Sequence, residues 1–197
     1  MSSTSSTIRP AVVLFGALTL ICGVVYPFAV TGIGAVAFPE QAGGSIVEVA
    51  GKPVGSSLIG QSFTSPQYFW GRPSATGPMP NNGAGSGGSN FGATNPAQTD
   101  AVKGRVEALR AADPSNTAPI PVDLVTASGS GLDPEISVAA AQYQAGRVAA
   151  ARKLDPAKVR GLIEAKRSGQ LLGFFGEPRV NVLALNLALD AETGRTR

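Results

Sequence analysis

The sequence predicts an α+β protein: one N-terminal transmembrane helix followed by a single small exported α/β domain with a Gly/Ser/Asn-rich loop. Residues 10–39 carry no charged side chain. A bilayer-spanning helix needs roughly twenty apolar residues, so this run is long enough to cross a membrane. The chain beyond it alternates strand-like and helix-like patterns, and about 155 residues suffice for one domain with a modest core.

The flanks of the apolar run predict its orientation. Arg9 is the one charged residue before the run, and a cation on that side favours a cytoplasmic N-terminus. We therefore expect a cytoplasmic tail at 1–9, a span at 10–38 kinked at Pro27, and an exported domain at 39–197. A cleaved signal peptide is the competing interpretation, because Ala35-Val-Ala37 fits the A-x-A cleavage pattern. The apolar run is about twice as long as a signal core, which favours retention.

The first part of the exported domain reads as short strands and loops. Residues 45–50 alternate between glycines and predict a strand, residues 51–54 a turn, and residues 57–63 a second strand. Three adjacent aromatic residues at 68–70 lie between prolines, as is typical of a core or an interface. Residues 74–98 are almost all Gly, Ser, Asn, Ala, Thr and Pro. That composition predicts a loop that is either flexible or ordered by a partner.

The second part reads as three helices and a strand. The helices are predicted to run from Thr99 to Asp113, from Asp133 to about Lys153, and from Asp155 to about Gly169, each beginning at an N-cap residue. Residues 147–167 hold seven cations and two carboxylates. This run is typical of a solvated helix face, and lipid phosphate or an acidic partner is the alternative contact. Alternating leucines in residues 180–190 favour a buried strand, with a helix left open by their Leu and Ala content.

Composition excludes several kinds of chemistry. The chain has no histidine, and its single cysteine, Cys22, lies inside the apolar run. Zinc clusters, disulfides within the chain and histidine general bases are therefore excluded. The 16 Lys and Arg residues exceed the 13 Asp and Glu residues only slightly, which predicts no nucleic-acid partner. We expect no catalytic residue, no metal ligand and no tightly bound cofactor, and the sequence assigns no cofactor-binding residue.

Residues 120–137 gather the polar groups best suited to a site. Hydroxyls, glycines and carboxylates precede a predicted helix start, where free N–H groups attract anions. The segment lacks the lysine of a P-loop, G-x-x-x-x-G-K-S/T, and matches no EF-hand spacing. A weak cation site remains an alternative, with five oxygen donors: Asp123, Ser128, Ser130, Asp133 and Glu135. An exported enzyme is another alternative, with Ser128 or Ser130 as the nucleophile and Lys103 or Lys153 as the base.

Several strings in the chain resemble one family. They are Leu58-Ile-Gly-Gln-Ser-Phe, Tyr68-Phe-Trp-Gly-Arg-Pro-Ser-Ala, Gly87-Gly-Ser-Asn-Phe-Gly-Ala-Thr-Asn-Pro, Pro121-Val-Asp-Leu-Val-Thr-Ala-Ser-Gly-Ser-Gly-Leu-Asp-Pro, Ala141-Gln-Tyr-Gln and Gly176-Glu-Pro-Arg-Val-Asn-Val-Leu. In this order they resemble the C subunit of the bacterial Kdp potassium-transporting ATPase, the KdpC family. The resemblance covers nearly the whole chain, including the single N-terminal span.

The resemblance implies a non-catalytic accessory subunit of a high-affinity, ATP-driven potassium uptake pump in the bacterial inner (plasma) membrane. Its implied partners are a P-type ATPase subunit, a channel-like potassium-translocating subunit, a small membrane peptide and membrane lipid. Potassium is then the transported ion. ATP enters through the partner subunit, whose ATP affinity this chain raises as a catalytic chaperone. Because the predicted orientation exports the domain while ATP is cytoplasmic, that coupling must be indirect.

The resemblance also suggests where partner or ion contacts lie. The candidate residues at an outer ion entrance are Asn90, Asn95, Asp123, Ser128, Ser130, Asp133 and Glu135. Carboxylates at such a place concentrate cations weakly. The alternative function is a membrane-tethered extracellular module that binds potassium or another solute, for which saturable binding by the chain alone is expected.

Overall fold

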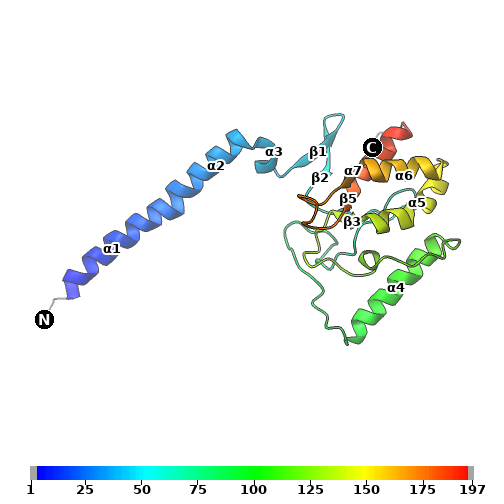
Figure 1. Ribbon diagram of the computed structural model, residues 1–197. Helices are drawn as coiled ribbons and strands as arrows, with labels where there is room; N and C mark the ends of the chain where they lie inside the picture. Colours follow the sequence, from blue (N-terminus) through cyan, green and yellow to red (C-terminus); the bar gives the residue numbers. More distant parts are fainter. Residues whose placement is uncertain (1–3, 195–197) are drawn as a thin grey trace. The chain divides into compact units, whose positions relative to one another are not determined.

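The computed structural model describes residues 4–194, and their side chains from residue 6 onward. The chain forms two compact units, one ending at Ile46 and the other beginning at Val47. The first holds an apolar helix and the second mixes helices with short strands (Figure 1). The predicted α+β class with one apolar N-terminal helix is therefore confirmed.

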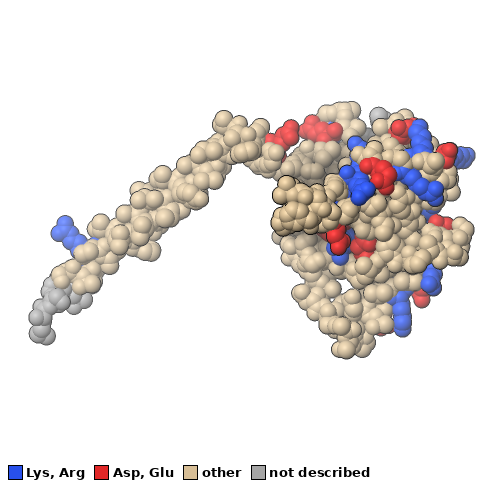
Figure 2. Space-filling view, in the orientation of Figure 1, with Lys and Arg blue, Asp and Glu red and all other residues tan. Residues whose placement is uncertain are grey.

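The first unit is built around one long apolar helix. It comprises α1 (Thr4–Leu20), a π-helical segment (Ile21–Val25) and α2 (Tyr26–Ala37), followed by the short α3 (Pro39–Ala42). Residues Ser6–Ala37 are long and apolar enough to cross a membrane, and their most apolar stretch is not buried against the rest of the chain. At 1.5 Å per residue this helix is about 48 Å long. Beyond its N-terminal end the helix shows no charge in Figure 2.

Pro27 lies where the long helix changes its hydrogen-bond register. Proline has no N–H to donate to the carbonyl four residues earlier. The π-helical segment directly precedes it, and the N–H of Tyr26 donates to the carbonyl of Ile21, five residues back. The predicted disturbance at Pro27 thus takes the form of a π-helical turn inside a continuous helix.

A two-stranded hairpin, β1 (Ile46–Val49) and β2 (Lys52–Ser56), spans the boundary at Val47 where the second unit begins. The strand predicted at 45–50 is confirmed. The predicted turn at 51–54 is wrong, because Ala50 and Gly51, at φ of 51° and 74°, already reverse the chain. The strand predicted at 57–63 is wrong too. Those residues form turns and irregular backbone, and the N–H of Gly60 donates to the carbonyl of Leu132 instead of to a neighbouring strand.

A three-stranded antiparallel sheet forms the centre of the second unit. Its order is β3 (Glu135–Ser137), β5 (Arg179–Asn181) and β4 (Arg167–Ser168). Ile136 lies opposite Val180 in the register, and both are buried. Around the sheet lie α4 (Pro96–Ala112), the 3-10 turn η2 (Val122–Leu124), α5 (Val138–Arg152), α6 (Pro156–Ala165) and α7 (Val182–Glu192). Their apolar faces form one core, whose fully buried members include Phe69, Ala140, Val148, Val159, Ile163, Leu185 and Leu189.

Two of the three predicted helix starts are wrong. The cap of α4 is Asn95, not Thr99, and its side chain accepts the N–H of Ala97. The cap of α5 is Ser137, not Asp133, because residues 135–137 first pair with β5. The start at Asp155 is confirmed. The predicted end at Gly169 is too late because β4 begins at Arg167.

The buried strand predicted at 180–190 is mostly a helix. Only Arg179–Asn181 pair in the sheet, as β5. The Asn181 side chain then accepts the N–H of Ala184 and caps α7. The leucine alternation is compatible with both structures. However, the buried positions 182, 183, 185, 186, 189 and 190 follow helical spacing, and Leu and Ala are strong helix formers.

A segment at 66–70, a turn followed by irregular backbone, crosses the core without belonging to a sheet. Buried amide side chains replace a neighbouring strand: Asn186 exchanges bonds of 2.8 and 3.0 Å with the backbone of Phe69, and Gln144 bonds of 2.9 and 3.1 Å with that of Trp70. Arg147 donates to the carbonyl of Pro66 at 2.6 Å. The backbone of this segment is therefore satisfied by side chains of α5 and α7.

Two buried guanidinium groups complete this arrangement. Arg147 stacks over the Trp70 ring at 4.2 Å, and burial lowers the pKa of Arg147 to about 10, against the opposing effects of Asp113 and Tyr143. Arg152 forms an ion pair of 2.7 Å with Asp190 on α7. Arg147 stays charged at neutral pH, so its charge requires the carbonyl and amide oxygens around it.

Candidate functional site

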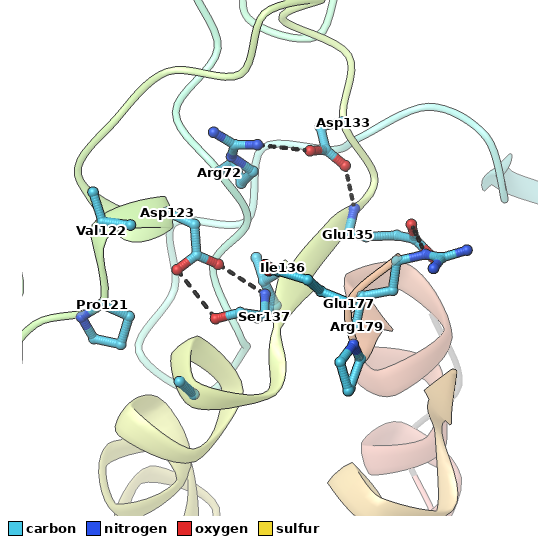
Figure 3. A pocket seen from close by; sticks show the side chains of 12 residues that line it. Arg72, Pro121, Val122, Asp123, Asp133, Glu135, Ile136, Ser137, Glu177 and Arg179 are labelled. Atoms are coloured by element: carbon cyan, nitrogen blue, oxygen red, sulfur yellow. Dashed lines mark hydrogen bonds and ion pairs between the residues drawn. The ribbon is translucent and has the colours of Figure 1, made fainter. Parts of the chain in front are cut away.

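A pocket of about 470 Å³ lies where η2, β3 and β5 meet, and Figure 3 shows the side chains that line it. Its charged lining consists of four carboxylates and two guanidinium groups: Asp123, Asp133, Glu135, Glu177, Arg72 and Arg179. Three of the predicted site residues, Asp123, Asp133 and Glu135, are therefore brought together. The lining carries two more negative than positive charges, which attracts cations weakly.

Asp123 ties η2 to the start of α5. Its carboxylate accepts the backbone N–H of Ser137 at 2.8 Å and the Ser137 hydroxyl at 3.1 Å. The Ser137 hydroxyl oxygen in turn accepts the N–H of Ala140 at 3.0 Å. Both oxygens of Asp123 are thus occupied by the chain itself (Figure 3), so this carboxylate holds the wall of the pocket.

Asp133 joins the irregular segment before β3 to Arg72. Its Oδ2 lies 3.1 Å from Arg72 Nη1, and its Oδ1 accepts the N–H of Glu135 at 3.0 Å. The two paired side chains are 27 % and 29 % exposed, so the pair stays accessible to an ion or a partner. The Nε of Arg72 is buried without a hydrogen-bond partner.

Glu135 and Arg179 form the second ion pair at the pocket, with 2.6 Å between Oε2 and Nε. They lie on neighbouring strands, β3 and β5, in the register that places Glu135 opposite Asn181. Arg179 is 47 % exposed, so water screens this pair strongly. Glu177 and Pro178, just before β5, continue the pocket wall.

The other four predicted site residues do not line this pocket. Ser128 is buried, and its hydroxyl has no hydrogen-bond partner. The Ser130 hydroxyl accepts the N–H of Leu132 at 3.1 Å. Asn95 caps α4, and Asn90 is an exposed loop residue with a φ of 53°.

Residues 128–132 anchor the Gly/Ser/Asn-rich loop. The carbonyl of Ser130 accepts the N–H of Gly87 at 2.8 Å, and that of Gly131 accepts the Ser74 hydroxyl at 2.6 Å. Gly131 has a φ of 69°, and a Cβ there would lie 2.5 Å from the Thr76 methyl group. The loop is thus held by contacts within the chain, and these contacts use the backbone carbonyls of Ser130 and Gly131 and not the hydroxyls of Ser128 and Ser130.

Sequence reasoning missed four polar residues of the pocket: Arg72, Ser137, Glu177 and Arg179. Arg72 and Arg179 lie in strings that were noted for the family resemblance, next to prolines and aromatic residues, without a spacing that predicts ion pairs. Ser137 was hidden by the wrong helix start at Asp133. In the described part of the chain, no group of three or more Asp, Glu or Cys side chains is close enough to hold a metal ion.

The fold and the pocket define a class: a small mixed α/β domain with a charged surface pocket, carried by a chain with one N-terminal helix fit to span a membrane. The family model described as K+-transporting ATPase, c chain, matches residues 8–191. The chain therefore belongs to the KdpC family of K+-transporting ATPase subunits. This confirms the resemblance seen in the sequence.

Individual relatives agree along nearly their whole length. The chain is 70 % identical over 185 residues to the potassium-transporting ATPase KdpC subunit of Janthinobacterium sp. (strain Marseille), covering 94 % of this chain and 98 % of that one. It is 69 % identical to the KdpC subunit of Herminiimonas arsenicoxydans, over 94 % and 97 % of the two chains. It is 65 % identical to that of Polaromonas naphthalenivorans (strain CJ2), over 93 % and 94 %.

Proposed function

We propose that this chain is the non-catalytic accessory subunit of a high-affinity, ATP-driven potassium uptake pump. In this role it stabilises the complex and raises the ATP affinity of the P-type ATPase subunit as a catalytic chaperone. The observation that carries the proposal is the match to the KdpC family over residues 8–191. The relatives named as potassium-transporting ATPase subunits match over almost their full lengths.

The proposed partners are the P-type ATPase subunit, the channel-like potassium-translocating subunit, a small membrane peptide and the surrounding lipid. The proposed placement is a single pass of the bacterial inner membrane, with residues 1–9 in the cytoplasm, the span at 10–38 and the domain outside. Arg9 before the span supports this orientation. ATP and the domain then lie on opposite sides, so the chain acts on ATP affinity through its partners.

We propose the charged pocket as the place where the domain meets a partner or the incoming ion. Asp133 and Glu135 are paired with arginines yet accessible, and the pocket has an excess of negative charge. Such a field raises the local cation concentration, and salt screens it. Asn95, which caps α4, and Ser130, whose carbonyl accepts the N–H of Gly87, are proposed to act through the neighbouring loop, together with Asn90 in that loop and the buried Ser128.

Purified pump complexes with and without this chain test the proposal. Potassium-stimulated ATPase activity is measured over a range of ATP concentrations. The ATP concentration for half-maximal activity should rise several-fold when the chain is left out, or the complex should fall apart. An unchanged assembly with unchanged ATP dependence contradicts the proposal and favours a tethered binding module.

The pocket is tested separately by neutralising its carboxylates in the intact pump. Asp133→Asn and Glu135→Gln keep the side-chain shapes and remove charge. Each should raise the potassium concentration for half-maximal activity up to a few-fold at low ionic strength, with the difference shrinking in about 0.15 M choline chloride. Glu107→Gln, on the exposed face of α4, is the matched control. Equal effects of the three variants would exclude a local role of the pocket.

A further inference from the structure

The loop between β4 and β5 presents an unusual group of exposed apolar side chains. Residues 169–176 read Gly-Gln-Leu-Leu-Gly-Phe-Phe-Gly and carry no charge. Leu171, Leu172, Phe174 and Phe175 are 70 %, 76 %, 67 % and 55 % exposed. We call residues 169–176 the apolar tip. A group of large apolar side chains of this kind marks a surface that meets another apolar phase or a partner.

The apolar tip is an ordered turn. Leu171 and Phe175 pair across it, with backbone bonds of 2.9 and 3.0 Å. The side chain of Gln170 donates to the carbonyl of Gly176 at 2.8 Å. Leu172 and Gly173 take left-handed φ values of 55° and 81°, which turn the chain tightly. The backbone is thereby satisfied, and the apolar side chains point outward as a formed projection.

The apolar tip begins beside the place where the chain enters the second unit. Val47 is the first residue of that unit. It shares the lining of one cavity with Lys166, Asn181 and Ala184. Lys166 directly precedes β4 and Asn181 ends β5. The two strands on either side of the tip therefore have their far ends at this cavity, beside Val47. In Figure 1 the tip is the orange loop that connects them, and the same loop is uncharged in Figure 2.

The length of the connection limits how far this end can be from the bilayer. The helix fit to cross a membrane ends at Ala37, so residues 38–46 form the whole connection to Val47. Nine residues span at most about 30 Å when fully extended, and the helical turn α3 (Pro39–Ala42) shortens that reach. The chain between the helix and Val47 therefore allows the base of the apolar tip to reach the membrane surface.

We propose that the apolar tip inserts into the headgroup and upper acyl region of the membrane that anchors the chain. Leucine and phenylalanine side chains favour that boundary, where burial of apolar area provides the binding. The exposed Lys166 and Arg167, at the foot of the tip, lie where lipid phosphate can accept their hydrogen bonds.

A fluorescent label at the apolar tip tests this directly in the full-length chain. In a Cys22→Ser background, Phe174→Cys supplies a single thiol for an environment-sensitive dye. The control carries the dye at Glu107→Cys on α4. Both are reconstituted into phosphatidylcholine vesicles containing phosphatidylglycerol, with a fraction of the lipid bearing a nitroxide quencher near the headgroup. We expect several-fold stronger quenching at position 174 than at 107, and equal quenching at the two positions overturns the proposal.

Two further measurements separate lipid from other contacts. With the dye at Leu172→Cys, the changes Phe174→Ser and Phe175→Ser should reduce quenching to the level of the control, while Trp70 emission reports an intact fold. The labelled chain is then measured in the assembled pump. Persistent quenching by lipid supports the proposal. Blue-shifted emission without lipid quenching means that a protein partner covers the tip, and that outcome overturns it.

Discussion

The segment at 66–70 and the apolar tip at 169–176 are both irregular in structure, and both carry adjacent aromatic residues. In the first, Phe69 is completely buried, and side-chain amides and guanidinium groups satisfy the backbone. In the second, Phe174 is 67 % exposed, and the turn satisfies its own backbone. Apolar composition is the same in kind, so it does not decide which segment enters the core.

The two segments differ in the hydrogen-bond partners that the rest of the chain provides for their backbone. An extended segment can be buried only if its N–H and C=O groups find partners. Gln144 on α5 and Asn186 on α7 provide such partners from buried positions, whereas the tip satisfies its backbone through its own turn and the side chain of Gln170. The turn forms without entering the core, so its large apolar side chains stay exposed, and this exposure is the basis for proposing a membrane contact.

The largest expected effect compares one phenylalanine from each region. Phe69→Ala should lower the free energy of unfolding by about 3–5 kcal/mol, because it leaves a large cavity in the core. Phe174→Ala should change it by less than about 0.5 kcal/mol, since that side chain is exposed. Urea unfolding of the full chain in micelles, followed by Trp70 emission, measures both. Similar losses for the two variants would remove the distinction between the regions.

The second effect tests the side chains that hold the buried segment. Gln144→Leu removes the partners of the Trp70 N–H and C=O groups and should cost about 2–6 kcal/mol, at about 1–3 kcal/mol for each unsatisfied buried group. Gln142→Leu, two residues away and half-buried, loses only an exposed bond to Glu164; it is the matched control and should cost less than about 0.5 kcal/mol. The same unfolding measurement applies. A stable Gln144→Leu variant would show that the segment is held by apolar packing alone.

The sequence predicted the apolar helix, β1, the region of α4 and the start of α6, because each depends on local signals: an uncharged run, an alternation, or a cap followed by proline. It failed at Asp133 and at residues 180–190, where pairing between β3 and β5 overrides a good cap signal and where leucine spacing fits two structures. Such pairings join positions about 45 residues apart, and no local pattern encodes them.

The candidate site could be predicted only in part, because part of it depends on contacts between segments far apart in the sequence. Asp123, Asp133 and Glu135 were found because they are close in sequence. Arg72 and Arg179 come from segments far along the chain, and they meet the carboxylates only after folding. Ser128 and Ser130 were chosen because hydroxyls beside glycines resemble a phosphate-binding loop, and in the structure the backbone of this segment anchors residues 74–98.

A smaller effect tests the close approach of Gly131 to Thr76. This contact holds the Gly/Ser/Asn-rich loop against residues 128–132. Gly131→Ala should cost about 1–3 kcal/mol, because a Cβ would be forced against Thr76 from a left-handed backbone. Gly129→Ala meets nothing within 4 Å and is the control. Limited proteolysis within residues 74–98 should become faster only in Gly131→Ala. Equal cleavage of both variants would mean that the loop does not depend on this close approach.

The smallest expected change in the free energy of unfolding concerns Arg179, which lies between the apolar tip and the pocket. The same residue also tests whether the negative charge of the pocket controls the potassium dependence of the pump. Arg179→Gln breaks the exposed pair with Glu135 and should cost only about 0.2–1 kcal/mol in urea unfolding. In the pump, however, it leaves four carboxylates against one guanidinium group in the pocket lining. It should therefore lower the potassium concentration for half-maximal ATPase activity, whereas Glu135→Gln, which breaks the same pair, should raise it. Shifts in the same direction for both variants would mean that the broken pair, and not the charge of the pocket, controls potassium dependence.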